Sequence, residues 1–548
     1  MSGILGDLSP PSGPGTNRLL YGDNLTVMRN MPSGCVDLIY LDPPFNSQRS
    51  YNLIYKQLTG LPLPEQEEAF CDAWELDPEK EEMARRMPVV LQQYGADDDL
   101  VAFWSAWIAA LRKAQPALLA YLVFMTYRLL EMRRILKPTG SIYLHCDPTA
   151  SHYIKVMMDG VFGAAAFKNE IVWRRSHAHS DAKQGARHYG RVSDTILFYT
   201  MGDKYTFNVQ HLPYADGYVS RDYKYADPDG RRYRLSDMSG PGGEGKGNPF
   251  YEVMGVSRHW RYSKERMAEL IAQGRVVQTR PGAVPQYKRY LDEGKGVPLQ
   301  NIWTDMPGIN NRSKEYLGYP TQKPVALLER IISTSTDDAQ VVFDPFCGCG
   351  TTIYAAHQLG RRWIGCDVAI WSVRIVRDVL LKRYGVREGV DYRVSGIPTS
   401  LDSADDLFNR DPRQFQHWVV ELAGGFPSMK HSGDRGIDGS VYYETATGLR
   451  RMLVSVKGGK HVSPAFVREL RGALAREANA DMAGFICMAE PTRGMTQEAA
   501  EAGMFAYQGR DYPRLQIRTV ADLLEGRGFD TPSRVQTLQR DRQGVLAV

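Results

Sequence analysis

Two short apolar runs, each ending in a turn, constrain the fold of this chain more than any other feature. Residues 36–41 are followed by an acid and two prolines, and residues 341–343 by an acid and a glycine-rich turn. Each run reads as a buried strand, and the second leads from its strand into a helix. Residues 18–394 alternate between strand-like and helix-like segments. This alternation predicts an α/β fold, with a doubly wound, mostly parallel sheet and helices on both faces.

The chain of 548 residues is too long for one ordinary core, so two or three domains are expected. Between about residues 200 and 305 the alternation is lost, and Tyr, Arg and Gly become frequent, which predicts an irregular insertion. The segment 396–411 shows no periodic apolar face and is expected to be a linker. The predicted organisation is a flexible leader at 1–17, a main domain at 18–395, the linker at 396–411, a second, smaller α/β domain at 412–529 and a tail at 530–548.

Composition indicates a soluble, cytoplasmic protein without a membrane partner. The seven cysteines are scattered and odd in number, which fits a reducing compartment better than a disulfide framework. A zinc site at Cys347, Cys349 and Cys366 is disfavoured because no second close pair accompanies them. The net charge of +4 permits a nucleic-acid partner without arguing for one.

A rigid pair of hydrogen-bond acceptors is expected where the first strand ends. Asp42 supplies a carboxylate and Pro43 a main-chain carbonyl, and the rings of Pro43 and Pro44 keep the chain extended. Phe45 adds an aromatic ring beside them. Two acceptors next to a ring suit a planar amino group, such as the exocyclic nitrogen of a nucleobase.

The glycine turn after the second strand predicts a nucleoside-binding site. Its glycines, Gly348 and Gly350, would let a ligand approach the backbone, and Asp367 ends a further strand where it could bind ribose hydroxyls. Dinucleotide-dependent oxidoreductases use similar glycines. However, Phe346 supplies an apolar wall where a pyrophosphate would need a cradle, so S-adenosylmethionine fits better. Upstream, Thr321 and the amides that open the helix at 325–332 could hold its carboxylate.

These residues resemble the amino-methyltransferases of DNA, specifically the group in which the catalytic motif precedes the cofactor motif. The resemblance covers roughly residues 18–385 and rests on six motifs in one order, at 21–24, 42–45, 144–148, 319–324, 343–350 and 364–367. The residues assigned to the cofactor are Asp23, Thr321, Asp344, Phe346, Gly348, Gly350, Thr351 and Asp367.

The resemblance implies that a target base is flipped out of double-stranded DNA and stacked on Phe45. Asp42 and the Pro43 carbonyl would accept hydrogen bonds from its amino group, whose lone pair then faces the methyl donor. The catalytic residues are therefore expected to be Asp42, Pro43, Pro44 and Phe45. The acidic form of the motif is commoner in adenine-N6 enzymes of this family, so adenine is favoured, and cytosine-N4 methylation remains the alternative.

A loop between two strands predicted at 169–173 and 194–199 concentrates positive charge. Its cations could contact DNA phosphates, although a solvated loop is the simpler interpretation. The insertion, with its Tyr and Arg residues, could read base edges. The predicted phosphate contacts are Arg174, Arg175, Lys183, Arg187 and Arg191.

The C-terminal domain resembles the type IV restriction endonuclease (Mrr-like) family. Asp438 begins one strand and Lys457 ends the next, a layout in which the acid binds Mg²⁺ and the lysine assists at the phosphate. The resemblance departs at Ser455, where such nucleases carry a carboxylate or an amide, and Glu421 could compensate in part. The alternatives are a Mg²⁺-dependent nuclease and a nuclease-like domain that only binds DNA. Either would suit restriction-modification or phage defence, with other subunits as potential partners.

Overall fold

The computed structural model describes most of the chain. The described residues are 8, 16–44, 50–52, 68–71, 74–177, 187–241, 247–310, 312–317, 319, 321–428, 436–445, 448–459 and 461–532. Two compact units are distinguished: Val209–Gln300, and the remainder of the chain.

A nine-stranded sheet organises the predicted main domain. Its order is β16-β6-β7-β5-β2-β17-β18-β1-β19, and β7 runs antiparallel to both neighbours while the other pairings are parallel. The predicted α/β class and mostly parallel sheet are therefore confirmed. Its strands, in chain order, are β1 (Asn17–Tyr21), β2 (Val36–Leu41), β5 (Leu136–Cys146), β6 (Phe167–Arg174), β7 (Ser193–Thr200), β16 (Ile302–Trp303), β17 (Val341–Asp344), β18 (Arg362–Asp367) and β19 (Tyr392–Ser395).

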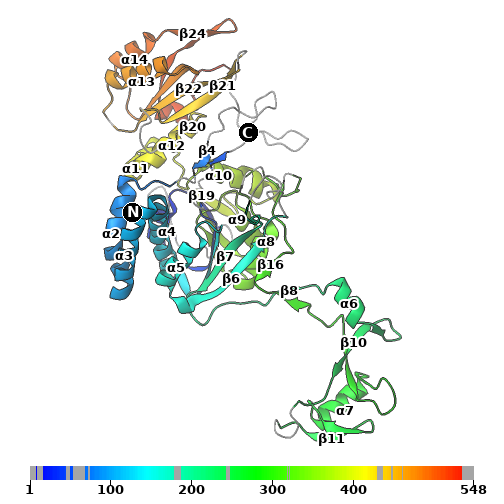
Figure 1. The fold of residues 1–548 in the computed structure, drawn as a ribbon. Coiled ribbons are helices and arrows are strands. Elements are labelled where there is room, and N and C mark those ends of the chain that lie inside the picture. Colours follow the sequence, from blue (N-terminus) through cyan, green and yellow to red (C-terminus); the bar gives the residue numbers. More distant parts are fainter. Residues whose placement is uncertain are drawn as a thin grey trace. The chain divides into compact units, whose positions relative to one another are not determined.

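Helices cover both faces of this sheet. In Figure 1, α4 and α5 lie on one side of β6 and β7, and α8 and α9 on the other. Strand β2 is buried at every position because both of its faces are covered. No helix among the described residues is long and apolar enough to cross a membrane. The helices are α1 (Asn24–Asn30), α2 (Pro78–Gln93), α3 (Asp98–Ala114), α4 (Pro116–Ile135), α5 (Ser151–Phe162), α8 (Val325–Ser335), α9 (Thr351–Gln358) and α10 (Ile370–Arg374), with a 3-10 turn at Ala164–Ala166, a π-helical turn at Ile375–Leu381 and a hairpin of β3 (Ser50–Asn52) and β4 (Glu68–Cys71).

The two runs that dominated the sequence lie side by side in the sheet. Strand β17 pairs with β2 in parallel, with Val342 opposite Leu38 and Phe343 opposite Ile39. From β2 the chain crosses to β5 on one side, and from β17 it crosses to β18 on the other. Such a reversal of direction opens a crevice at the carboxyl ends of the two strands. Asp42 and the glycine turn therefore meet at one edge of the sheet.

The insertion is more regular than expected. The unit Val209–Gln300 has its own core, which includes Met238, Trp260 and Leu270. The expectation of irregular structure failed because its strands carry few buried apolar residues, as in β10, where no position is fully buried, so their sequences show no apolar alternation. Its elements are β8 (His211–Leu212), α6 (Asp216–Asp222), β9 (Tyr225–Ala226), β10 (Arg232–Asp237), β11 (Phe250–Val253), β12 (Val256–His259), α7 (Lys264–Ala272), β13 (Val276–Val277), β14 (Gln286–Tyr290) and β15 (Val297–Pro298).

Residues 412–524, called the C-terminal unit below, belong to the larger of the two compact units and contain a five-stranded sheet in the order β20-β21-β22-β23-β26. Its elements are α12 (Pro412–Leu422), β20 (Phe426–Pro427), β21 (Gly439–Thr445), β22 (Gly448–Lys457), α13 (Pro464–Arg476), β23 (Ala480–Cys487), α14 (Arg493–Ala500), β24 (Met504–Tyr507), β25 (Arg510–Pro513), β26 (Leu515–Thr519) and α15 (Val520–Leu524). The segment 396–411 was expected to be a linker, but it has regular structure. It contains α11 (Leu401–Arg410), which begins at a capping box of Ser400 and Ser403 and buries Ala404 and Leu407.

Candidate active site

Asp42 lies just beyond β2 and forms an ion pair with Lys323. The Lys323 ammonium donates to Asp42 Oδ2, and only 16% of the Asp42 side chain is exposed. The same ammonium lies 3.3 Å from the Thr321 carbonyl. The second carboxylate oxygen, Oδ1, is buried and has no hydrogen-bond partner among the described residues. A buried polar atom without a partner is costly. Asp42 Oδ1 is therefore available to accept a hydrogen bond from a bound ligand.

A buried polar relay supports the strand that carries Asp42. Burial raises the pKa of Tyr40 well above its usual value, so its hydroxyl stays protonated, and it shares a hydrogen bond of 2.9 Å with His145 Nδ1. His145 Nε2 then donates to Asp194 Oδ2 at 3.2 Å. Arg175 Nε lies 3.3 Å from Asp194 Oδ1, an ion-pair contact without hydrogen-bond geometry. Burial alone would raise the pKa of Asp194, but the bond from His145 and the charge of Arg175 outweigh it and lower that pKa.

The glycine turn has the backbone that a close approach by a ligand requires. Gly348 and Gly350 have φ angles of 49° and 83°, in the left-handed region that glycine adopts without strain. A Cβ at Gly348 would lie 3.3 Å from the Tyr319 ring, which leaves little room for a side chain. The Gly348 amide donates to Asp367 Oδ2 at 2.8 Å and so links the turn to the end of β18.

Two buried carboxyl groups border this turn. Burial raises the pKa of Asp344 to about 7 and that of Asp367 to about 6. Main-chain amides partly offset burial, since the Phe346 N–H donates to Asp344 at 3.0 Å and the Ala369 N–H donates to Asp367 at 2.9 Å. Carboxyls held in this way are ionised more readily beside a cation. These two carboxyl groups thus fit a ligand that carries positive charge and hydroxyl groups, as S-adenosylmethionine does.

Asp23 has a structural role that its predicted cofactor role did not include. Its side chain accepts from the Thr26 amide at the start of α1 and forms an ion pair with Arg128. Arg128 Nε also donates to Asn24 Oδ1 at 2.6 Å, and Asn24 donates to the Pro345 carbonyl at 2.7 Å. This chain of contacts holds the start of the glycine turn, so Asp23 positions the turn whether or not it meets the ligand.

The other predicted residues of the crevice are placed as follows. Phe346 is half-buried, with its ring centroid 6.4 Å from that of Phe124. Thr351 is buried, and its hydroxyl lies 3.7 Å from Cys349 Sγ. Phe45, expected to stack on the base, lies outside the described residues.

The predicted phosphate-binding loop is only partly described. Arg187 and Arg191 are exposed, and Lys183 lies outside the described residues. Arg174 donates to the Thr304 carbonyl at 2.8 Å, and Arg175 is held by the buried Asp194. Arg174 and Arg175 therefore have internal partners, whereas Arg187 and Arg191 have the exposure that a phosphate contact needs.

The predicted metal ligand of the C-terminal unit is engaged by the protein itself. Asp438 Oδ2 accepts from the Val456 amide at 2.6 Å and lies 3.5 Å from Ser455 Oγ. Lys457 Nζ lies 5.2 Å from the Phe466 ring centroid. Burial raises the pKa of Glu421 to about 8, so this acid is largely neutral at pH 7. Among the described residues, no three His, Cys, Asp or Glu side chains gather into a group that could hold a metal ion.

Comparison with known families agrees with this architecture. Residues 36–377 match the family described as DNA methylase, and the chain belongs to that family. Residues 412–525 match a family described as NACHT-associated inactive restriction endonuclease 1. The C-terminal unit is therefore similar to an endonuclease-like family described as inactive, and its Mrr-like type is not supported.

Several curated proteins are similar to the methylase part. The type II methyltransferase M.EcaI of Enterobacter cloacae is 31% identical over 298 residues, which cover 53% of this chain and 62% of that protein. The StyLTI Mod subunit, part of a type III restriction-modification enzyme of Salmonella typhimurium, is 28% identical over 63% of this chain and 50% of its own length. The DNA adenine methyltransferase YhdJ of Escherichia coli is 24% identical over 64% of this chain and 78% of its own. The chain thus spans less than two thirds of the first two relatives.

Two solved structures align with about two thirds of this chain. A DNA modification methylase of Thermus thermophilus, complexed with S-adenosyl-L-methionine, aligns over 70% of this chain and all of its own, with 15% identity and a TM-score of 0.32. The cytosine-N4-specific PvuII methyltransferase aligns over 67% of this chain and 88% of its own, with 12% identity and a TM-score of 0.31.

Sequence reasoning missed the partners of the predicted residues. Lys323 lies in the motif at 319–324, but no role was predicted for it. A cation two residues after Thr321 could have indicated a partner for the Asp42 carboxylate. Tyr40 and His145 also lie in segments singled out at strand ends. Nothing in the local sequence indicated that Asp194 would bind His145 or that Arg128 would pair with Asp23, because the two residues of each pair lie far apart along the chain.

Proposed function

We propose that this protein is an S-adenosylmethionine-dependent DNA methyltransferase that modifies the N6 amino group of adenine. The observation that carries the proposal is the pairing of β2 with β17, which sets the Asp42 acceptor beside the glycine turn at one edge of the sheet. Membership of the DNA methylase family supports the same reaction class.

In this proposal Asp42 and the Pro43 carbonyl accept hydrogen bonds from the target amino group and orient its lone pair. Lys323 pairs with the Asp42 carboxylate and holds it in position, and the hydrogen bonds from Tyr40 through His145 to Asp194 keep the strand end in place. Bound S-adenosylmethionine would supply the methyl group as an electrophile. The protein then contributes positioning and electrostatic stabilisation, which are large terms for such a transfer.

The choice of adenine rests on the acidic form of the motif at Asp42 and on similarity to an enzyme named as a DNA adenine methyltransferase. Cytosine-N4 methylation is the alternative. Mass spectrometry of nucleosides from DNA incubated with the full chain and S-adenosylmethionine tests the choice. We expect N6-methyladenine. N4-methylcytosine alone would overturn the base assignment, and no methylated nucleoside on any DNA would overturn the function.

The affinity for S-adenosylmethionine is expected to fall as the pH drops through 7. The ligand is positively charged and favours the ionised forms of Asp344 and Asp367, whose pKa values lie near 7 and 6. An acid with a pKa near 7 that must ionise weakens binding about tenfold between pH 8 and pH 6. Isothermal titration calorimetry over this range measures the effect.

Two controls accompany this titration. S-adenosylhomocysteine lacks the sulfonium charge and should show a smaller pH dependence. Asp344→Asn removes one titrating group and should flatten the curve. A dissociation constant for S-adenosylmethionine that stays constant between pH 8 and pH 6 would contradict the proposed charge coupling.

We further propose that the C-terminal unit binds DNA without cutting it, within a restriction-modification or phage-defence system that includes other subunits. Three features support the absence of cleavage: Ser455 in place of a carboxylate, the internal partners of Asp438, and the family description as inactive. A hydroxyl is a poor Mg²⁺ ligand compared with a carboxylate.

Incubation with supercoiled plasmid and Mg²⁺, with the plasmid unmodified or methylated, is expected to leave it uncut. Lys457→Glu, which reverses a charge at the end of β22, should weaken duplex binding by the full chain. Mg²⁺-dependent cutting that disappears in Asp438→Ala would restore the nuclease interpretation. Unchanged duplex affinity in Lys457→Glu would remove the binding role assigned to this surface.

A further inference from the structure

The sheet of the insertion carries different charge arrangements on its two faces. Strands β10 and β14 pair antiparallel, with Tyr233 opposite Tyr290 and Arg234 opposite Arg289. Side chains alternate between faces along a strand, so the tyrosine pair and the arginine pair lie on opposite faces. These are called the tyrosine face and the arginine face below.

On the tyrosine face, cations are matched by acids. Lys288 Nζ lies 2.6 Å from Asp227, and Tyr290 donates to the same carboxylate. The hydrogen bond from Lys288, joined by that from Tyr290, lowers the pKa of Asp227 and keeps it charged. The charges of Lys288 and Asp227 therefore cancel, and the polar groups of this part of the face bind one another.

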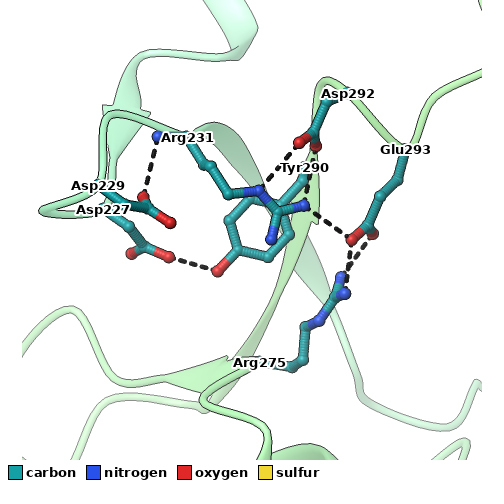
Figure 2. Close-up of polar contacts among 7 residues, drawn as sticks. All are labelled: Asp227, Asp229, Arg231, Arg275, Tyr290, Asp292 and Glu293. Carbon is teal, nitrogen blue, oxygen red and sulfur yellow. Dashed lines mark hydrogen bonds and ion pairs between the residues drawn. The ribbon is translucent and has the colours of Figure 1, made fainter.

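Figure 2 shows the same matching for two arginines beside Tyr290. Arg231 donates to Asp292 at 2.9 and 3.0 Å and to Glu293 at 3.0 Å, and its guanidinium lies 4.0 Å from the Tyr290 ring centroid. Arg275 donates to both oxygens of Glu293 at 2.5 Å. The charge of each arginine is therefore already matched by an acid, although Arg231 is adjacent to Arg232 in the sequence.

On the arginine face, cations stand together without acids. Arg232, Arg234 and Arg289 share this face, and no carboxylate of the described residues lies within ion-pair distance of any of them. Arg232 donates to two main-chain carbonyls at 3.0 and 3.1 Å, and Arg289 donates to Ser236 Oγ at 3.2 Å. Arg234 Nε is buried and has no hydrogen-bond partner among the described residues.

The Arg234–Arg289 pair lowers the stability of the isolated sheet, because like charges directly opposite each other repel. The repulsion disappears when an anion binds between them. Along β10, Arg232 and Arg234 are two residues apart, a separation of about 7 Å. A row of cations at this spacing suits a repeating polyanion better than a single anion.

We propose that the arginine face is the surface by which the insertion contacts the phosphates of duplex DNA, with Arg234 and Arg289 as its centre. The inference rests on the proposed function and assigns it a specific surface. It also predicts that the compensated arginines near Tyr290 maintain the fold of the insertion and make no contact with DNA.

The test compares full-chain Arg234→Ala/Arg289→Ala with the matched control Arg266→Ala. Arg266 is, like Arg289, an exposed arginine of the insertion, but it already pairs with Glu269 at 2.6 Å. The readouts are the affinity for a mixed-sequence duplex at several salt concentrations and the KM for sheared genomic DNA in methyl transfer. We expect the double variant to bind at least about tenfold more weakly and its salt slope to fall by about 2. The control should match wild type.

A circular-dichroism spectrum and a resistance of the insertion to limited proteolysis that both match wild type show that the double variant is folded. If it does not fold, Arg289→Gln, at an exposed position, should still lower the salt slope by about 1. A wild-type salt slope and DNA KM in both variants would overturn the surface assignment while DNA methylation stands. If wild type binds DNA through this face yet methylates none, the proposed function fails and the surface assignment holds.

Discussion

Asp42→Asn is expected to reduce methyl transfer by at least about a thousandfold, because one stabilising contact in a preorganised site contributes a factor of about 10² to 10³ and the amide also adds a competing donor. The carboxylate lies at the crevice with one oxygen on Lys323 and the other unpaired. Single-turnover transfer of a radiolabelled methyl group to DNA measures the loss.

Two checks separate loss of chemistry from loss of fold in this variant. S-adenosylmethionine should still bind to Asp42→Asn, since Asp344 and Asp367 lie on β17 and β18 and not on β2. Glu82→Gln, on the surface helix α2, makes the same chemical change at a half-exposed side chain and should retain wild-type activity. Retention of more than about a tenth of wild-type activity in Asp42→Asn would remove the proposed mechanism, given the expected magnitude.

Lys323→Met is expected to lower activity at pH 7 about tenfold, because it leaves a largely buried carboxylate without its cationic partner. The ammonium is the partner of Asp42 and is itself only 11% exposed, so solvent screens the pair weakly. Without this partner the carboxylate is held less firmly in the position from which it meets the amino group. Initial rates of methyl transfer at pH 7 measure the loss.

Lys323→Arg keeps the charge and should restore most of the wild-type activity. If Lys323 only filled space, its charge would not matter, and the Met and Arg variants would lose activity alike. Equal activity in Lys323→Met and Lys323→Arg would therefore show that the ion pair with Asp42 does not contribute to methyl transfer.

Much of the architecture followed from local pattern. The strands at β2, β17 and β18 and the turn at Gly348 were predicted because a sheet covered on both faces demands apolar runs, and a left-handed turn favours glycine. The hairpin of β6 and β7 was predicted for similar reasons. Mostly polar segments with few buried positions defeat this logic, which explains why the insertion was expected to be irregular and α11 was missed.

The chain alone determined which groups end its strands: an acid after β2 and glycines after β17. Only the tertiary structure decided which groups meet them. Lys323 reaches Asp42 across 281 positions, and the register of β10 on β14 sets Arg234 opposite Arg289. Local sequence encodes backbone preference and burial, whereas partnership between charges depends on strand order and register, which arise from packing of the whole sheet.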